Sequence, residues 1–227
     1  MRVAVFDLDG TLADTAADLI AAANGALAEA GYGSPLDRLA HRAEAFAGGR
    51  AMLRAGLAAH ALADAEAEVT RAYPRLLELY RDGIDRETRL YPGVEAAFDR
   101  LQAADWRLAV CTNKPLALAE TLLARLGVRG RFEAVLGADS LSVRKPDPLH
   151  LLETIARSGG APERAVLVGD TVTDREAARA AGVPCVLVTF GPEGAAVARM
   201  EPAALLDAYP DLPAMLERLV PARPIPT

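Results

Sequence analysis

Five short apolar runs, each ending at a polar residue or a glycine, constrain the fold of this chain more than any other feature. The runs are Val3–Phe6, Leu108–Cys111, Ala134–Leu136, Ala165–Val168 and Cys185–Val188. Near-continuous apolar runs of this length are typical of strands in a parallel sheet that is covered on both faces. Helical patterns separate the later runs, at Val94–Ala104, Leu116–Leu126, Leu149–Ser158 and Arg175–Ala181. A glycine follows three of these helices, as a C-terminal stop should: Gly127, Gly159 and Gly182. The alternation predicts an α/β protein with a Rossmann-like, doubly wound parallel sheet.

The stretch between the first and second runs is too long for a simple crossover, since about a hundred residues intervene. Residues 16–82 are rich in Ala, Leu, Arg and Glu and have helical periodicity. We expect Pro35, Gly48-Gly49 and Pro74 to break them into several helices. The predicted organisation is a Rossmann-like core over residues 1–14 and 89–227, with an all-α helical domain inserted over residues 15–88. The Pro-rich tail, residues 221–227, is expected to contribute little structure.

Composition excludes several classes of protein. The net charge of −6 argues against a nucleic-acid partner, which would require a basic face. No apolar run approaches the roughly 18 residues that cross a membrane. The first structured run begins at Arg2, which leaves no room for a signal peptide, so we expect a cytoplasmic protein. The two cysteines lie inside apolar runs and form neither a disulfide framework nor a metal pattern.

Lysine is almost absent from the chain. Of 25 basic residues only Lys114 and Lys145 are lysines, and all the others are arginines. Because lysine is a compact point charge and arginine a broad planar fork, these two positions are candidates for sites that require a compact ammonium group. Codon drift is the alternative explanation.

Aspartates follow two of the predicted strands. Asp7 and Asp9 come directly after the first run, and because strand residues alternate sides, both should point the same way. Asp170 and Asp174 follow the fourth run. Open α/β sheets bind ligands at the carboxyl ends of their strands, and four carboxylates that converge there require a cation, for which hard oxygen ligands favour Mg²⁺. The alternative is that Asp9-Gly10 is only a turn and Asp174 only a helix N-cap.

Polar residues also follow the second and third runs. Thr112-Asn113-Lys114 ends the second run and offers a hydroxyl donor at the same edge. Lys145 follows the third run, between Arg144 and Pro146, where prolines restrict the backbone. Both lysines are therefore predicted beside strand ends, where a phosphate could bind.

Four ordered strings carry a resemblance to a known family. DLDGTL, CTNK, KPDP and GDTVTD are similar to the four signature motifs of the haloacid-dehalogenase-like hydrolase superfamily. The helical insert resembles the small helical cap of that superfamily, and core and cap together cover nearly the whole chain. CTNKP and the segment GDTVTDREAARAAGVP resemble the phosphoglycolate-phosphatase-like branch. The compact KPDP string departs from many relatives in that branch, which separate the Lys-Pro pair from a later Asp-Pro.

The resemblance implies roles for the acidic residues. Asp7 would attack phosphorus in line and form an aspartyl-phosphate, while Asp9 would protonate the leaving alcohol and later take a proton from water. The carboxylates of Asp7 and Asp170, with the backbone carbonyl of Asp9, would hold Mg²⁺. Asp174 would anchor metal-bound water or orient Lys145. Asp9 and Asp170 favour phosphate chemistry over dehalogenation, in which the leaving halide needs no proton.

The resemblance also implies contacts to the substrate. Thr112 would hydrogen-bond the transferring phosphoryl group and Lys145 would neutralise its charge. Asn113 is a further substrate-binding candidate, and Lys114 either reaches an anionic group of the substrate or stays solvated at a helix start. Arg50 in the cap either recognises a carboxylate or distal phosphate or belongs to an ordinary helix–helix turn.

These residues predict an Mg²⁺-dependent phosphatase for a small phosphorylated metabolite, with 2-phosphoglycolate favoured by resemblance. The alternatives are a phosphomutase similar to β-phosphoglucomutase, or a phosphatase for sugar phosphates or nucleoside monophosphates. A receiver-type phospho-acceptor domain is disfavoured by the inserted cap, and a silent binding protein by the presence of Asp7 and Asp9. We expect a monomer or homodimer, with no nucleic-acid or membrane partner.

Overall fold

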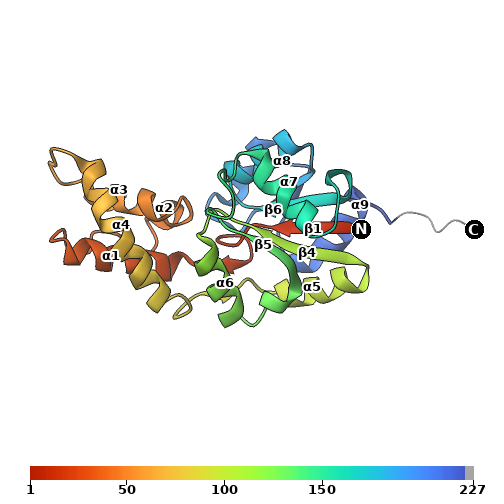
Figure 1. The fold of residues 1–227 in the computed structure, drawn as a ribbon, viewed down its shortest axis with the longest axis horizontal. Coiled ribbons are helices and arrows are strands. Elements are labelled where there is room, and N and C mark those ends of the chain that lie inside the picture. The colour runs from red at the N-terminus through yellow and green to blue at the C-terminus, as the bar shows by residue number, and fades with distance from the viewer. Residues whose placement is uncertain (223–227) are drawn as a thin grey trace, which may run out of the picture. The chain divides into compact units, whose positions relative to one another are not determined.

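Six parallel strands form the main sheet of the computed structural model, which describes residues 1–222 (Figure 1). The strands are β1 (Arg2–Phe6), β4 (Trp106–Cys111), β5 (Phe132–Leu136), β6 (Ala165–Gly169), β7 (Cys185–Val188) and β8 (Ala204–Leu206). Their order across the sheet is β5-β4-β1-β6-β7-β8, so β1 has β4 on one side and β6 on the other. The predicted fold class, an α/β protein with a Rossmann-like parallel sheet, is confirmed.

Five of these strands coincide with the five apolar runs, whereas β8 is not predicted from the sequence. β8 has only three residues and pairs in parallel with β7 alone. Leu205 remains 37% exposed in it. A short strand at the edge of a sheet is less buried than a central strand. Its run of apolar residues is therefore too short to be recognised in the sequence.

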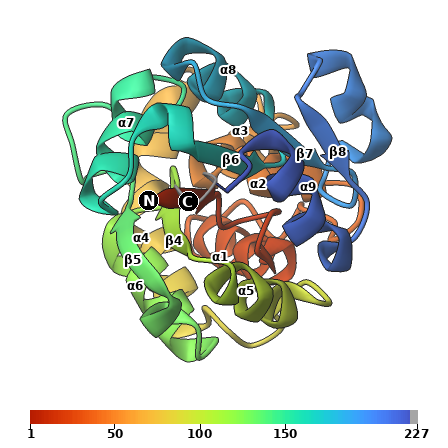
Figure 2. The same cartoon turned by 90° about the vertical axis from the view of Figure 1, so that its right-hand side faces the viewer.

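Helices cover both faces of the sheet. They are α5 (Val94–Ala103), α6 (Leu116–Arg125), α7 (Pro148–Arg157), α8 (Val172–Ala181) and α9 (Leu212–Leu219). Figure 2 shows α7 and α8 on one face and α5 and α9 on the other. On the first face Val5 lies in one apolar cluster with Leu151 of α7. On the second face Phe6 packs edge-on against Phe98 of α5, with ring centroids 5.4 Å apart. Because β1 is buried on both faces, its sequence is a continuous run of apolar residues from Val3 to Phe6.

The ends of these helices follow local sequence signals. The predicted glycine stops are confirmed, since Gly127, Gly159 and Gly182 have φ values of +75°, +70° and +67°. Short 3-10 helices occur at Arg129–Arg131 (η1), Pro162–Arg164 (η2), Gly194–Met200 (η3) and Tyr209–Asp211 (η4). α8 begins at Val172, earlier than the predicted start at Arg175, because Thr171 and Asp174 form a capping box ahead of it.

The chain divides into two compact units. One comprises Met1–Leu12 and the chain from Leu90 onward, and the other comprises Ala13–Arg89. The sequence pattern predicts these divisions after residue 14 and before residue 89. The second unit contains α1 (Ala16–Glu29), α2 (Arg42–Phe46), α3 (Gly49–Leu57) and α4 (Ala65–Asp82). The short strands β2 (Ala13–Asp14) and β3 (Arg89–Leu90) pair with each other where the chain enters and leaves this unit.

Pro74 does not break a helix, contrary to the prediction, but lies inside α4. A proline at this position removes the N–H that would bond to the carbonyl of Thr70. The buried side chains of α4 lie on both sides of the proline, at Val69 and Ala72 before it and at Leu76 after it. This apolar packing on both sides of Pro74 outweighs the tendency of proline to end a helix. Helix propensity, which considers each residue locally, does not include such packing.

Asp18 of α1 fixes the end of the helical unit. Its carboxylate accepts hydrogen bonds from the N–H of Glu87 at 3.0 and 3.1 Å and from both the N–H and the hydroxyl of Thr88 at 2.9 and 2.8 Å. Asp18 is only 5% exposed. This buried carboxylate therefore holds the returning segment against the first helix of the unit.

Among residues 1–222, no helix combines the length and the apolar character that a membrane span requires. Residues 223–227, which include most of the Pro-rich tail, lie outside the described part of the chain.

Candidate active site

β1 ends directly before Asp7, and Asp9 follows two residues later. The N–H of Asp7 donates to the carbonyl of Val168 in β6 at 2.9 Å, so the sheet fixes the backbone up to the first carboxylate. Asp7 is 9% exposed, and the side chain of Asp9 is 17% exposed. Both aspartates therefore lie at the carboxyl edge of the sheet, largely withdrawn from solvent.

β6 and α8 bring two more carboxylates to this edge. Asp170 follows β6 and Asp174 lies in the first turn of α8, and both are fully buried. One carboxylate oxygen from each of Asp7, Asp170 and Asp174 lies within 4.8 Å of the others. A Cβ atom on Gly169 would overlap the Asp174 carboxylate, so only glycine at this position lets α8 carry Asp174 so close to the strand.

Asp174 has hydrogen-bond partners at both of its oxygens. Oδ1 accepts from the ammonium of Lys145 at 2.6 Å, while Oδ2 accepts from the N–H and hydroxyl of Thr171 at 3.1 and 2.8 Å. Asp174 is thus the N3 residue of the capping box and not the N-cap itself, which is Thr171. Its contacts suit the expected role of orienting Lys145 better than direct coordination of a cation.

Each of the two lysines of the chain lies beside carboxylates at this edge. Lys145 Nζ lies 2.9 Å from Asp7 Oδ1 and 2.6 Å from Asp174 Oδ1. Lys114 Nζ lies 2.9 and 3.0 Å from the two oxygens of Asp9. Both lysines are buried, with 3% and 6% exposure respectively. The only two lysines of the chain therefore both lie buried at this edge, each beside a carboxylate, a placement that codon drift does not predict.

Negative charge exceeds positive charge at this edge. Burial raises the pKa of Asp7 to about 6, although Lys145 lowers it and Asp174 raises it further. Burial, together with Asp7 and Asp174, also raises the pKa of Asp170 well above its usual value. Burial opposes the charge on Lys145, but Asp174 and Asp7 outweigh this and raise its pKa above the usual range. The lysine stays charged while the carboxylates around it lack sufficient neutralisation.

The loop after β4 places a hydroxyl at the same edge. Thr112 is 1% exposed, and its Oγ1 accepts from the N–H of Lys114 at 3.2 Å. That contact uses a lone pair and leaves the hydroxyl proton available to donate to a phosphoryl oxygen. The side chain of Asn113, by contrast, donates to the carbonyl of Lys145 at 2.9 Å. This hydrogen bond joins the loop after β4 to the loop that carries Lys145.

Arg50 belongs to the helical unit, in the first turn of α3. Its guanidinium lies over the ring of Tyr73, 4.6 Å from the centroid, and donates to the Thr70 hydroxyl at 3.3 Å. Both partners belong to α4, so the unit itself holds this exposed cation in place. Its predicted role in substrate binding stays a prediction.

Two polar side chains near this edge, those of Thr11 and His150, are not predicted from the sequence to have a role. Thr11 donates to Asp170 Oδ1 at 2.8 Å, a partner that no local pattern indicates. His150 is fully buried, with Nε2 3.1 Å from the carbonyl of Gly137 and Nδ1 3.5 Å from the thiol of Cys111. Burial and the charge of Lys145 lower the pKa of His150 to about 4, so the ring is neutral and packs behind the site.

The acidic group has the composition of a cation site. Asp170 Oδ2 is buried and has no hydrogen-bond partner within the described chain, although a buried carboxylate oxygen ordinarily has one. One lysine serves Asp7 and Asp174 together, and no lysine or arginine pairs with Asp170 among residues 1–222. Oxygen ligands with excess negative charge fit a hard divalent cation, so this buried group could hold a metal ion.

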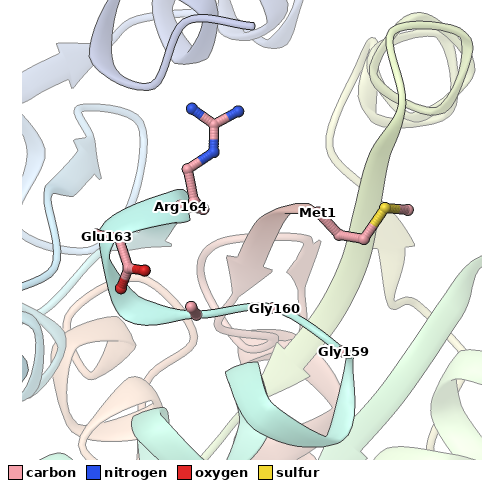
Figure 3. Close-up of a pocket in the computed structure, with 6 residues that line it drawn as sticks. Met1, Gly159, Gly160, Glu163 and Arg164 are labelled. Atoms are coloured by element: carbon pink, nitrogen blue, oxygen red, sulfur yellow. The ribbon is translucent and has the colours of Figure 1, made fainter. Parts of the chain in front are cut away.

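A separate pocket of about 310 Å³ opens at the opposite end of the strands (Figure 3). It is lined by Met1, which precedes β1, and by residues before β6: Gly159, Gly160, Ala161, Glu163 and Arg164. None of the residues predicted for the site lines it. The chemistry of the sheet is therefore concentrated at its carboxyl edge and not at this pocket.

Buried carboxylates and two ammonium groups lie together at the carboxyl edge of a parallel sheet, the edge at which open α/β sheets bind their ligands. The chain belongs to the haloacid dehalogenase-like hydrolase family, whose sequence model matches residues 1–182. The resemblance that the four motifs carry is thereby confirmed, and the protein is an enzyme.

Relatives extend the match along almost the whole chain. A protein of Agrobacterium fabrum named phosphoglycolate phosphatase is 41% identical over 221 residues, covering 96% of this chain and 94% of its own. One of the same name from Mesorhizobium japonicum is 42% identical and covers 97% of each chain. The crystal structure of a predicted phosphoglycolate phosphatase from Haemophilus somnus superposes with a TM-score of 0.85 at 26% identity, over 95% of this chain and 97% of that one. These names agree with the branch expected from the motifs, despite the compact KPDP string.

Proposed function

We propose that this protein is an Mg²⁺-dependent phosphatase that hydrolyses 2-phosphoglycolate through an aspartyl-phosphate on Asp7. The observation that carries the substrate is the near full-length likeness to relatives named phosphoglycolate phosphatase. The observation that supports the chemistry is the placement of Asp7, Asp9 and both lysines at one edge of the sheet.

The first half of the reaction transfers the phosphoryl group to the enzyme. A carboxylate oxygen of Asp7 attacks phosphorus, and the bond between phosphorus and the ester oxygen breaks. Asp9 gives its proton to that oxygen, which leaves as the hydroxyl of glycolate. Lys145, 2.9 Å from Asp7, and the hydroxyl of Thr112 stabilise the charge that spreads over the phosphoryl oxygens.

The second half returns the enzyme to its starting state. Asp9, now a carboxylate, accepts a proton from a water molecule as that water attacks phosphorus. The bond between Asp7 and phosphorus breaks, and inorganic phosphate leaves. Asp174 contributes by holding Lys145 at 2.6 Å, which keeps the ammonium beside the reacting carboxylate throughout.

Asp7 and Asp170 would hold the Mg²⁺ ion, together with the backbone carbonyl of Asp9 and with Asp174 close by. The unpartnered, buried Oδ2 atom of Asp170 supports this proposal. When bound, the ion supplies positive charge that screens the carboxylate nucleophile from the phosphate dianion and orients the phosphoryl oxygens.

The carboxylate of 2-phosphoglycolate requires a cation of its own. We assign Lys114 this role, because its ammonium is the second cation buried at the edge that carries Asp7 and Asp9, and the first, Lys145, lies against Asp7. Arg50 is the candidate from the helical unit for the same group. Asn113 contributes to substrate binding indirectly, because its hydrogen bond to the carbonyl of Lys145 holds the loop that carries this lysine.

Phosphate release from a panel of esters tests the proposal. The panel contains 2-phosphoglycolate, 2-hydroxyethyl phosphate, hexose phosphates and nucleoside monophosphates, each with Mg²⁺ and with EDTA. We expect metal-dependent release that is fastest for 2-phosphoglycolate and is lost in Asp7→Asn. Faster release from a hexose phosphate or a nucleotide would contradict 2-phosphoglycolate as the substrate but would still support a phosphatase. Interconversion of hexose phosphates with little free phosphate would instead establish a mutase.

We extend the proposal to a cytoplasmic enzyme that acts on this small metabolite as a monomer or homodimer. Light scattering of the purified protein and fractionation of cells that express it would measure both properties.

A further inference from the structure

Thr11 and Tyr209 form a chain of hydrogen bonds that ends on Asp170. The phenol of Tyr209 donates to the backbone carbonyl of Thr11 at 2.7 Å. The hydroxyl of Thr11 in turn donates to Asp170 Oδ1 at 2.8 Å. All three residues are fully buried, so none of these contacts can exchange with bulk solvent.

The two oxygens of Asp170 consequently differ. Oδ1 accepts from Thr11, whereas Oδ2 has no hydrogen-bond partner within residues 1–222. A single donor on one oxygen fixes the rotation of the carboxylate and leaves the other oxygen available. The hydroxyl thus determines in which direction the unpartnered oxygen of Asp170 points.

The surroundings of Tyr209 keep the phenol in place. Its ring lies 5.7 Å from that of Phe190, which in turn lies 4.7 Å from the ring of Tyr91. Beside Phe190, a Cβ atom on Gly191 would come within 2.9 Å of the Asp170 Cβ. The segment after β7 therefore packs against both Asp170 and the loop that carries Thr11. Phe190, Gly191 and Tyr209 all lie beyond residues 1–182, the part that the family model matches.

We propose that Thr11 and Tyr209 are positioning residues that set the metal affinity of the site through Asp170. Thr11 holds the Asp170 carboxylate directly, and Tyr209 holds the backbone of Thr11. The inference rests on the proposed function in one respect, that Asp170 binds Mg²⁺. Groups that orient a metal ligand commonly change metal affinity by ten- to a hundred-fold, although they never touch the ion.

Two substitutions test the chain of contacts at nearly constant shape. Thr11→Val removes the hydroxyl but keeps the branched side chain, and Tyr209→Phe removes only the phenol oxygen. The matched control is Ser158→Ala, because Ser158 is also fully buried and its hydroxyl donates to a backbone carbonyl, that of Thr154, at 2.8 Å on the far end of α7. The dissociation constant for Mg²⁺ alone, without substrate, is measured from the rise of the thermal unfolding midpoint with Mg²⁺ concentration.

We expect Mg²⁺ to bind about tenfold more weakly to Thr11→Val and about threefold more weakly to Tyr209→Phe, with Thr11→Ser restoring the wild-type value. Ser158→Ala should lose stability without any change in the Mg²⁺ dissociation constant. Wild-type affinity in both Thr11→Val and Tyr209→Phe would overturn the inference. If the wild-type protein itself shows no shift with Mg²⁺, the proposed metal fails instead, and the two failures are distinguishable.

Discussion

The two edges of the sheet both bury a basic side chain beside a carboxylate, but they balance charge differently. At the amino edge Arg2 lies 2.6 Å from Glu217 and 4.7 Å from the centre of the Trp106 ring. The indole N–H of Trp106 also donates to Glu217, at 3.1 Å. At the carboxyl edge Lys145 faces both Asp7 and Asp174.

The difference separates a structural pair from a reactive site. Glu217 has an arginine and an indole as partners, and despite its desolvation these hydrogen bonds lower its pKa. Asp7 and Asp170 have raised pKa values, because burial outweighs the partners that they have. Removing one partner of a compensated pair costs stability, whereas an uncompensated buried charge costs stability until a ligand arrives. The compensated pair therefore lies at one end of the strands, and the carboxylates with raised pKa values lie at the other.

The largest expected effect comes from Asp7→Asn, which should separate activity from stability at the carboxyl edge. Removal of the nucleophile should lower phosphate release at least about 10⁴-fold. Removal of a poorly compensated charge should at the same time raise the free energy of unfolding by roughly 1–2 kcal/mol in EDTA, as measured by urea denaturation. Asp82→Asn, at an exposed carboxylate in the helical unit, is the control and should change neither quantity. A less stable Asp7→Asn protein would contradict the charge imbalance that we describe.

The opposite result is expected at the amino edge. Glu217→Ala leaves Arg2 buried without its carboxylate. Because the Glu217 side chain is itself 39% exposed, the free energy of unfolding should fall by about 2 kcal/mol, with the specific activity of the folded protein unchanged. Glu153→Ala is the matched control. It breaks an exposed pair with Arg157, and such a pair contributes less than about 1 kcal/mol. Equal losses in the two variants would show that the amino-edge pair has no special structural role.

His150 gives the site region a dependence of stability on pH. The unfolded ring binds a proton near pH 6.5 and the buried ring only near pH 4. Between these values the unfolded state binds more protons, so the free energy of unfolding falls as the pH falls, by up to about 3 kcal/mol. Asp7 shifts in the opposite direction, so the test is the difference between wild type and His150→Gln. The free energy of unfolding of wild type minus that of His150→Gln, measured by urea denaturation, should increase by up to about 3 kcal/mol from pH 4 to pH 7, and parallel curves would contradict a neutral buried ring.

The smallest expected effect concerns Lys114, the second lysine of the carboxyl edge. Lys114→Met should lower the preference for 2-phosphoglycolate over 2-hydroxyethyl phosphate about tenfold, since only the first ester has a carboxylate. The measurement is the ratio of kcat/KM for the two esters in Lys114→Met and, as the test of the other candidate, in Arg50→Met. An equal loss on both esters would mean that Lys114 acts on Asp9 alone. A changed ratio only in Arg50→Met would move carboxylate recognition to the helical unit.

The sequence predicts the central strands and the charged edge because both depend on local patterns. A strand buried on two faces needs an unbroken apolar run, and an aspartate at its end can lie only at the carboxyl edge. Asp7 and Asp170 are therefore predictable from position alone. The family resemblance then adds an expected role for each.

The remaining features depend on contacts that no local pattern records. Pro74 stays inside α4 because apolar packing continues on both sides of it. The ion pair between Lys114 and Asp9 joins residues from different strand ends. The contact between Tyr209 and Thr11 spans 198 positions along the chain. Such partners are determined by the folded backbone and cannot be read from the spacing of residue types.

The placement of the two lysines also makes the protein an unusual substrate for amine chemistry. Apart from the amino terminus, the only primary amines of the chain are Lys114 and Lys145, both almost fully covered at the carboxyl edge. An acylating reagent, a fluorescent succinimidyl ester or an aldehyde crosslinker will therefore find almost nothing to modify on the surface. Any slow labelling beyond the amino terminus reports how often this edge opens, which turns ordinary protein-conjugation reagents into a direct probe of access to the site.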